Sequence, residues 1–154
     1  MLTTSLQIRN QLAGLTDYQT GWDEQRRIHS AVADQAIPST VLLVEHPPVF
    51  TAGKRTQPTD RPIDGTPVID VDRGGRITWH GPGQLVGYPI VRLPNPVDVM
   101  DYVHRLEAAI MDVCSQYGID TKRVADRTGV WVEADEKGGE RKIVAIGVRV
   151  ARGV

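Results

Sequence analysis

The sequence predicts an α+β fold, in which a mixed β-sheet is combined with a few helices. Short apolar runs rich in β-branched residues recur along the chain, whereas only two segments place apolar residues at helical spacing. The 15 glycines and 10 prolines among 154 residues interrupt longer regular elements. Several strands separated by only two good helices are typical of an α+β domain rather than of a repeating parallel α/β fold.

The length and composition are those of one ordinary globular domain. The 154 residues carry 18 basic and 19 acidic side chains, for a net charge of −1, and 40% of the residues are hydrophobic. This balance gives no general attraction to nucleic acid or to an anionic membrane surface, and no apolar stretch is long enough to span a membrane. The single cysteine, Cys114, excludes an internal disulfide framework and predicts a reducing, cytoplasmic environment.

The first half of the chain is expected to begin with a short strand over residues 6–9 and a helix over 17–35. Thr16 and Gln19 fit a capping box at the start of that helix. Its predicted apolar face consists of Tyr18, Trp22, Ile28 and Val32. Residues 40–45 form a β-branched run without alternation, which predicts a central strand covered on both faces.

Residues 46–67 contain five prolines and two glycines, which predicts a long surface loop with a brief strand near residues 49–51. Long loops in compact domains are often functional, so this segment is a candidate lid or substrate wall. Further strands are predicted over the ranges 68–71, 76–79 and 85–93.

The second half is expected to contain a helix over residues 97–117, opened by Pro96 and Asp98 and ended by Gly118. Its apolar stripe is predicted to consist of Val99, Val103, Leu106, Ile110, Val113 and Tyr117. Strands are predicted over residues 130–134 and 141–150, the latter being the most regular of all.

A glycine-rich segment over residues 72–84 is the strongest candidate for a binding edge. Two glycines precede its strand and two follow it, so the backbone can approach a ligand closely at both bends. Freed backbone N–H groups could polarise a carbonyl there, and four side chains could orient a polar group: Arg73, Arg76, Thr78 and His80. The alternative is an ordinary glycine-rich hairpin.

The sequence contains no recognised pattern for binding a nucleotide or a metal cofactor. Neither the dinucleotide-binding glycine pattern nor the P-loop pattern is present. The four histidines lie at no recognised ligand spacing; they are His29, His46, His80 and His104. We therefore predict no metal and no cofactor.

Lys142 opens an otherwise apolar row on the predicted final strand, in phase with Val144 and Ile146. Burial in such a row would lower the pKa of the lysine and allow it to accept a proton near neutral pH. A strand-end lysine that reaches to water is the alternative. Cys114 belongs to the helix over 97–117, next to its apolar stripe, and is predicted to be a buried structural cysteine rather than a nucleophile.

Four segments occur in a distinctive order: VLLVEHPPVFTAGKR, then DRGGRITWHGPGQLVGYPIVRL, then TGVWV and KIVAIGVRV. In this order they resemble the lipoyl(octanoyl) transferase family, the octanoyltransferases of protein lipoylation. The resemblance implies the fold of the biotin and lipoate protein ligase catalytic domain. It also implies an acyl site lined by Arg73, Gly74, Gly75, Arg76, Ile77, Thr78, Trp79 and His80, together with Ala145, Ile146 and Gly147. Lys142 would lower the pKa of a catalytic cysteine.

The implied activity moves an octanoyl group from octanoyl-acyl carrier protein to a lysine of a lipoyl domain, through a cysteine acyl-enzyme. The acceptors would be lipoyl domains of 2-oxoacid dehydrogenase complexes and the glycine cleavage protein. The family's cysteine matches no residue here, so residues 1–154 are expected to be the N-terminal and central part of a single acyltransferase domain that continues beyond Val154. By itself this stretch is expected to be inactive. An adenylating lipoate or biotin ligase of the same fold, and a non-catalytic acyl-binding module, remain the alternatives.

Overall fold

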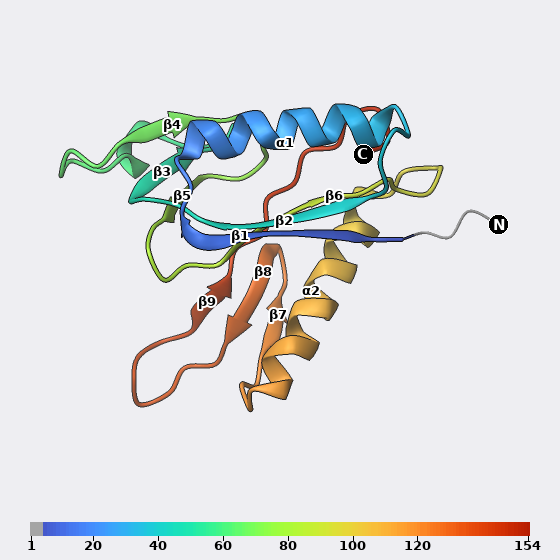
Figure 1. The fold of residues 1–154 in the computed structure, drawn as a ribbon. Coiled ribbons are helices and arrows are strands. Elements are labelled where there is room, and N and C mark those ends of the chain that lie inside the picture. The colour runs from blue at the N-terminus through green and yellow to red at the C-terminus, as the bar shows by residue number, and fades with distance from the viewer. Residues whose placement is uncertain (1–4) are drawn as a thin grey trace. The chain divides into compact units, whose positions relative to one another are not determined.

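The computed structural model describes residues 5–154 and confirms the α+β prediction (Figure 1). Within these residues the chain has two α-helices, one 3₁₀ helix and nine strands. It divides into two compact units, which we describe separately. The first unit contains the residues up to Asn95 together with Arg149–Val154, and the second contains Pro96–Val148. The expectation of one continuous acyltransferase domain stays a prediction.

The first sheet of the first unit has the order β1-β2-β6. Its strands are β1 (Gln7–Leu15), β2 (Thr40–Glu45) and β6 (Val86–Ile90). β2 is central, as predicted, and pairs in parallel with β1 and antiparallel with β6. The predicted bounds of the two outer strands were wrong. β1 continues to Leu15 through an irregularity in its register, and β6 ends at Ile90, three residues earlier than expected.

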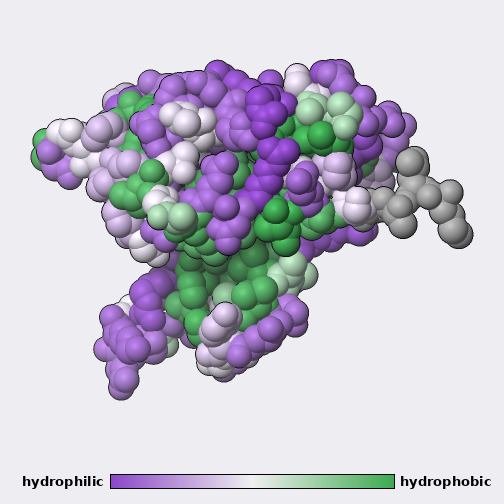
Figure 2. Space-filling view, in the orientation of Figure 1, coloured by the Kyte–Doolittle hydropathy of each residue, from purple (hydrophilic) through white to green (hydrophobic). Residues whose placement is uncertain are grey.

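Helix α1 (Tyr18–Ala33) runs along one face of this sheet and closes the core of the unit (Figure 1). The core residues that pack together are Ile28, Val32, Leu42, Val44, Val86, Ile90 and Val154. The predicted capping box was wrong. Asp17 is the N-cap and accepts a hydrogen bond from the backbone N–H of Thr20, while the N–H of Thr16 donates to the carbonyl of Glu45. The surface over α1 is mainly hydrophilic (Figure 2).

The second sheet of this unit has the order β4-β3-β5. Its strands are β3 (Val49–Ala52), β4 (Val68–Asp70) and β5 (Ile77–His80), and the short 3₁₀ helix Pro58–Asp60 lies between β3 and β4. β3 is the central strand, parallel to β4 and antiparallel to β5. The brief strand expected near residues 49–51 is therefore the middle of a sheet, and the irregular connection begins only after Ala52.

The second unit contains α2 (Val99–Gln116) and the antiparallel sheet β7-β8-β9. Its strands are β7 (Lys122–Val124), β8 (Arg127–Val132) and β9 (Arg141–Val144). The sequence analysis missed β7, which is only three residues long. It also placed the end of the last strand at residue 150, but β9 stops at Val144.

The predicted stripe on α2 was only partly correct. Val103 is buried, but Val113 and Tyr117 are 52% and 79% exposed. Glu107 and Cys114 are buried instead. Glu107 can be buried because one carboxylate oxygen accepts the N–H of Gly129 and the other accepts Nε of Arg123, both at 2.9 Å. Gly118 ends the helix as predicted, with a φ of +70°.

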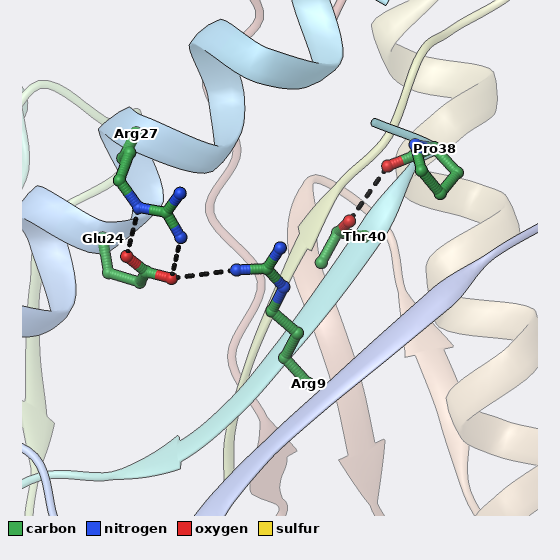
Figure 3. A network of polar contacts seen from close by, with 5 residues as sticks. All are labelled: Arg9, Glu24, Arg27, Pro38 and Thr40. Atoms are coloured by element: carbon green, nitrogen blue, oxygen red, sulfur yellow. Dashed lines mark hydrogen bonds and ion pairs between the residues drawn. The ribbon is translucent and has the colours of Figure 1, made fainter. Parts of the chain in front are cut away.

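A polar network joins α1 to β1 (Figure 3). The carboxylate of Glu24 accepts hydrogen bonds from Nε and Nη2 of Arg27, at 2.8 and 2.7 Å, and from Nη1 of Arg9 at 3.1 Å. These bonds, those from Arg27 first, lower the pKa of Glu24 below its ordinary value of 4.5. Glu24 is thus the ionic link between the helix and the edge strand.

Glu24→Gln is expected to lower the free energy of unfolding by about 1 kcal/mol at pH 7, the upper range for partly exposed ion pairs. The folded-state pKa lies below the unfolded value, so the stabilising effect is complete above pH 4.5 and is lost as the pH falls through the folded pKa. Urea denaturation between pH 7 and 3 measures the difference. The control is the exposed neighbour Asp23→Asn, and equal effects of both variants at all pH values would contradict the prediction.

Candidate functional site

The glycine-rich segment is tied by backbone hydrogen bonds to the residues that follow β3. The N–H of Lys54 donates to the carbonyl of Arg73 at 3.2 Å, and the N–H of Arg55 donates to the carbonyl of Gly75 at 3.0 Å. Gly53 lies in the closest part of this contact. A Cβ atom there would come within 2.6 Å of the carbonyl oxygen of Gly75 and 2.9 Å of that of Gly74. The two segments therefore meet backbone to backbone.

Arg73 holds the first bend together from inside. Its Nη1 donates to the carbonyls of Gly74 and Arg76 at 2.9 and 3.0 Å. Its Nη2 donates to the carbonyl and the hydroxyl of Thr51 at 2.9 and 2.8 Å. Burial lowers the pKa of this guanidinium, but it stays charged at any ordinary pH. Arg76 differs, because its exposed guanidinium pairs with Asp60 of the 3₁₀ helix.

His80 ends β5 and is bound through both ring nitrogens. Nδ1 lies 2.7 Å from Oε1 of Gln84, in the turn that follows the strand, and Nε2 lies 3.2 Å from Oγ1 of Thr51. Burial is the main cause that lowers the pKa of His80 below 6.5, and the positive charge of Arg73 lowers it further. The ring of Tyr18 stacks on His80 at a centroid distance of 6.2 Å. These contacts hold the His80 ring in one place, and its burial favours the uncharged form.

A buried histidine, His46, adjoins the half-buried His80 and was not assigned to the site from the sequence. His46 is fully buried, and its Nδ1 donates to the carbonyl of Thr16 at 2.6 Å. Its Nε2 lies 2.8 Å from the hydroxyl of Tyr88, and burial raises the pKa of that tyrosine. Gly21 makes room for the ring, because a Cβ there would lie 3.1 Å from Cε1 of His46.

The signal for these additional residues was weak in the sequence. His46 follows a buried strand and Tyr88 lies in another, so both sit where a core residue is the usual expectation. Only the pairing of β2 with β6, which places Leu42 opposite Tyr88, brings them close together. Thr51 was likewise hidden, because a threonine within a β-branched strand has no distinguishing pattern.

The remaining predicted residues of the first unit lie on β5. Ile77 and Thr78 are half-buried, and Thr78 is paired with Thr51 in the antiparallel register. Trp79 is 42% exposed, and its ring lies over the next turn, where a Cβ on Gly81 would come within 2.2 Å of it. The structure thus brings the side chains of Arg73 and His80 together at Thr51, but not those of Arg76 and Trp79.

Lys142 lies in the second unit, on β9, opposite Trp131 of β8. Its Nζ is 4.8 Å from the centre of the tryptophan ring, and the guanidinium of Arg127 lies 4.3 Å from the same centre. The Lys142 side chain also passes over Gly129, whose φ is +116° and where a Cβ would lie 3.3 Å from Cδ of the lysine. Lys142 is exposed as a whole residue, but partial burial of its amine, and then the positive charge of Arg127, lower its pKa below 10.5.

The other predicted residues of the second unit follow β9 without regular secondary structure. Ala145 and Gly147 are exposed, and Ile146 is half-buried. The apolar row expected at this end of the chain was partly correct, since Val144, Ile146 and Val148 are half-buried whereas Lys142 itself is classed as exposed. The two groups of predicted residues, 73–80 and 142–147, lie in different units, and each is described by itself.

Cys114 is a buried free cysteine on α2, as predicted, and is 8% exposed. Across residues 5–154, no group of three histidine, cysteine, aspartate or glutamate side chains is placed to hold a metal ion. Neither helix of the described chain has the length and apolar content that a membrane crossing requires.

Comparison with known proteins matches almost the whole chain to one family. The family model of the lipoyl protein ligase A/B catalytic domain covers residues 17–154. The octanoyltransferases of Salinispora arenicola and Salinispora tropica are each 60% identical to the chain over all 154 residues, which span 72% of those proteins. The octanoyltransferase of Streptomyces coelicolor is 48% identical over 181 residues, spanning 92% of this chain and 68% of that protein.

Proposed function

We propose, from the premise that this chain belongs to the lipoyl protein ligase A/B catalytic domain family, that it is an octanoyltransferase of protein lipoylation. The observation that carries the proposal is the 60% identity, over the whole chain, to the octanoyltransferases of two Salinispora species. The acyl donor is octanoyl-acyl carrier protein. The acceptors are lipoyl domains of 2-oxoacid dehydrogenase complexes and the glycine cleavage protein, and we place the reaction in the cytoplasm.

The proposed reaction has two steps that balance without a nucleotide or a metal. A thiolate attacks the octanoyl thioester, so that a new C–S bond forms, the bond to the carrier's sulfur breaks, and the carrier thiol takes up a proton. The amine of the target lysine then attacks the acyl-enzyme, an amide bond forms, and the enzyme thiol leaves. In the first step Lys142 takes the proton from the enzyme thiol and passes it to the departing carrier thiolate. In the second step it takes the proton from the attacking amine and passes it to the departing enzyme thiolate.

The chemistry of Lys142 supports this role. The ordinary pKa of a lysine, 10.5, leaves almost no free amine near neutral pH. The lowered pKa increases the fraction of free amine, and Arg127 contributes through its charge without competing for the proton. The aromatic face of Trp131 holds the protonated form of Lys142 close to the strand, at 4.8 Å from the ring centre.

Cys114 is not the nucleophile in this proposal. Its side chain is buried on the packed face of α2, where an acyl carrier's thioester would not reach it. The sequence holds no second cysteine, so the attacking thiol lies outside residues 1–154. The acyl chain would lie along the glycine-rich segment, where burial of each methylene contributes about 0.8 kcal/mol.

The complete gene product is expected to transfer octanoyl from octanoyl-acyl carrier protein to an apo lipoyl domain in the absence of ATP, measured as the mass increase of the lipoyl domain. Transfer that requires free octanoate and ATP would contradict the proposal and favour an adenylating ligase. The polypeptide that ends at Val154 serves as the comparison. It is expected to give no transfer and no hydroxylamine-labile adduct. An adduct that Cys114→Ser abolishes would overturn the assignment of Cys114 as structural.

A further inference from the structure

Thr51 lies between two polar side chains of the glycine-rich segment, Arg73 and His80. It is 0% exposed and sits in the central strand β3. Nη2 of Arg73 is 2.8 Å from its hydroxyl, and Nε2 of His80 is 3.2 Å from the same oxygen. One buried hydroxyl thus connects a permanently charged group to the imidazole ring.

The direction of each hydrogen bond in this chain of contacts follows from its ends. The Arg73 guanidinium can only donate, so Thr51 accepts from it. At the other end Nε2 of Gln84 donates to the carbonyl of Trp79 at 3.0 Å, so the amide oxygen is the atom that faces His80. Nδ1 of His80 must therefore carry the hydrogen. In the uncharged ring its Nε2 is then an acceptor, and the Thr51 hydroxyl donates to it.

We propose that Thr51 is a positioning residue of the acyl site, which fixes His80 in the tautomer protonated on Nδ1 and in a single ring orientation. Both ring nitrogens then make hydrogen bonds within the protein. His80 therefore forms an immobile, uncharged part of the acyl-site lining and neither gives nor takes a proton during transfer. The part of this statement that concerns acyl transfer rests on the proposed function. The part that concerns the ring does not.

The surroundings of the ring support a lining role rather than an acid–base role. Tyr18 stacks on one side at an interplanar angle of 19°, and His46 meets the ring edge-on at a centroid distance of 5.9 Å. Arg73 is fixed by four hydrogen bonds within the protein and cannot swing away from Thr51 without releasing the bend at Gly74.

The test combines ¹⁵N NMR of the histidine rings with kinetics of ATP-free octanoyl transfer, both on the complete gene product. Wild-type His80 is expected to show the Nδ1–H tautomer at pH 7, with an Nε2 signal shifted by an accepted hydrogen bond. Thr51→Val keeps the shape but removes the donor, so the Nε2 signal should move toward that of a free acceptor nitrogen. kcat/KM should fall about tenfold, because a buried partner is left unpaired. Thr51→Ser should restore both values.

Thr40→Val is the matched control, since Thr40 is also 0% exposed in a strand of the same unit and donates only to the carbonyl of Pro38 (Figure 3). It should change neither the His80 signal nor kcat/KM. An Nε2–H or charged ring in the wild type overturns the proposal even if Thr51→Val does not fold. The proposal is also overturned if Thr51→Val loses activity and Thr51→Ser does not restore it. It is likewise overturned if Thr40→Val loses as much activity as Thr51→Val. Absence of any transfer with the wild-type ring signals intact would instead refute the proposed function.

Discussion

Lys142→Ala in the complete gene product is expected to slow formation of the octanoyl-enzyme by about 10²–10⁴-fold, the usual contribution of a positioned acid–base group. The pKa of Lys142 is lowered below 10.5 by partial burial and by Arg127. The wild-type acylation rate should therefore rise with pH as the pH approaches this lowered pKa. Without Lys142 the thiol must ionise unaided, so the pH optimum should move upward. Stopped-flow or quenched acylation from octanoyl-acyl carrier protein, followed by mass spectrometry across pH 6–10, measures both effects.

Lys137→Ala is the control for this variant, because Lys137 is an exposed lysine in the turn before β9. Arg127→Gln is expected to have an effect between those of the wild type and Lys142→Ala. Removing its charge should raise the pKa of Lys142, so the rise in rate should occur at higher pH while Lys142 remains in place. Wild-type rates for Lys142→Ala at neutral pH would refute its role as the base.

Gly53→Ala is expected to produce the second large effect, a loss of about 10²-fold in octanoyl transfer, since displacements of about 1 Å in a catalytic site have costs of this size. The added Cβ would meet the carbonyl oxygens of Gly75 and Gly74 at 2.6 and 2.9 Å, and backbone atoms cannot yield as a flexible side chain can. The glycine-rich segment must therefore move. Overpacking of this kind should also lower the free energy of unfolding by about 1–3 kcal/mol.

Gly14→Ala provides the matched comparison, because a Cβ at Gly14 meets nothing within 4 Å. Urea denaturation and transfer assays of both variants separate local displacement from general loss of folding. If Gly53→Ala retained both wild-type activity and wild-type stability, the close backbone contact between residues 53 and 75 would not exist in solution.

Strong local patterns allowed most of the fold to be predicted from the sequence. The helix of Ile28 and Val32, the central strand at residues 40–45 and the end of α2 at Gly118 each had a regular period or a stop residue. The errors occurred where contacts between residues distant in the sequence determine the bounds of an element or its buried face. β9 stops at Val144 although its alternation continues, and the buried face of α2 includes Glu107, whose charge is satisfied only by Arg123 and Gly129 from the following sheet.

In the candidate site, too, residues with a local sequence pattern could be predicted and residues that depend on long-range contacts could not. Arg73 and His80 could be singled out because glycines surround them in the sequence. Their partner Thr51 could not, since 22 residues separate it from Arg73 and its hydroxyl gains a role only when β3 pairs with β5. The direction of the pKa shift of Lys142 was foreseen from its place in an apolar row. The contributions of Arg127 and Trp131 depend on the register of β8 against β9, which no local pattern reveals.

The division of the chain into two units has a consequence for synthesis on the ribosome. The first unit is discontinuous, because Pro96–Val148 is inserted between Asn95 and Arg149. Val154 belongs to the same core as Ile28 and Leu42, and the carbonyl of Gly153 accepts the N–H of Leu93 at 2.9 Å. The first unit, although its translation begins first, thus gains the core contacts of Val154 only after the inserted unit has been translated.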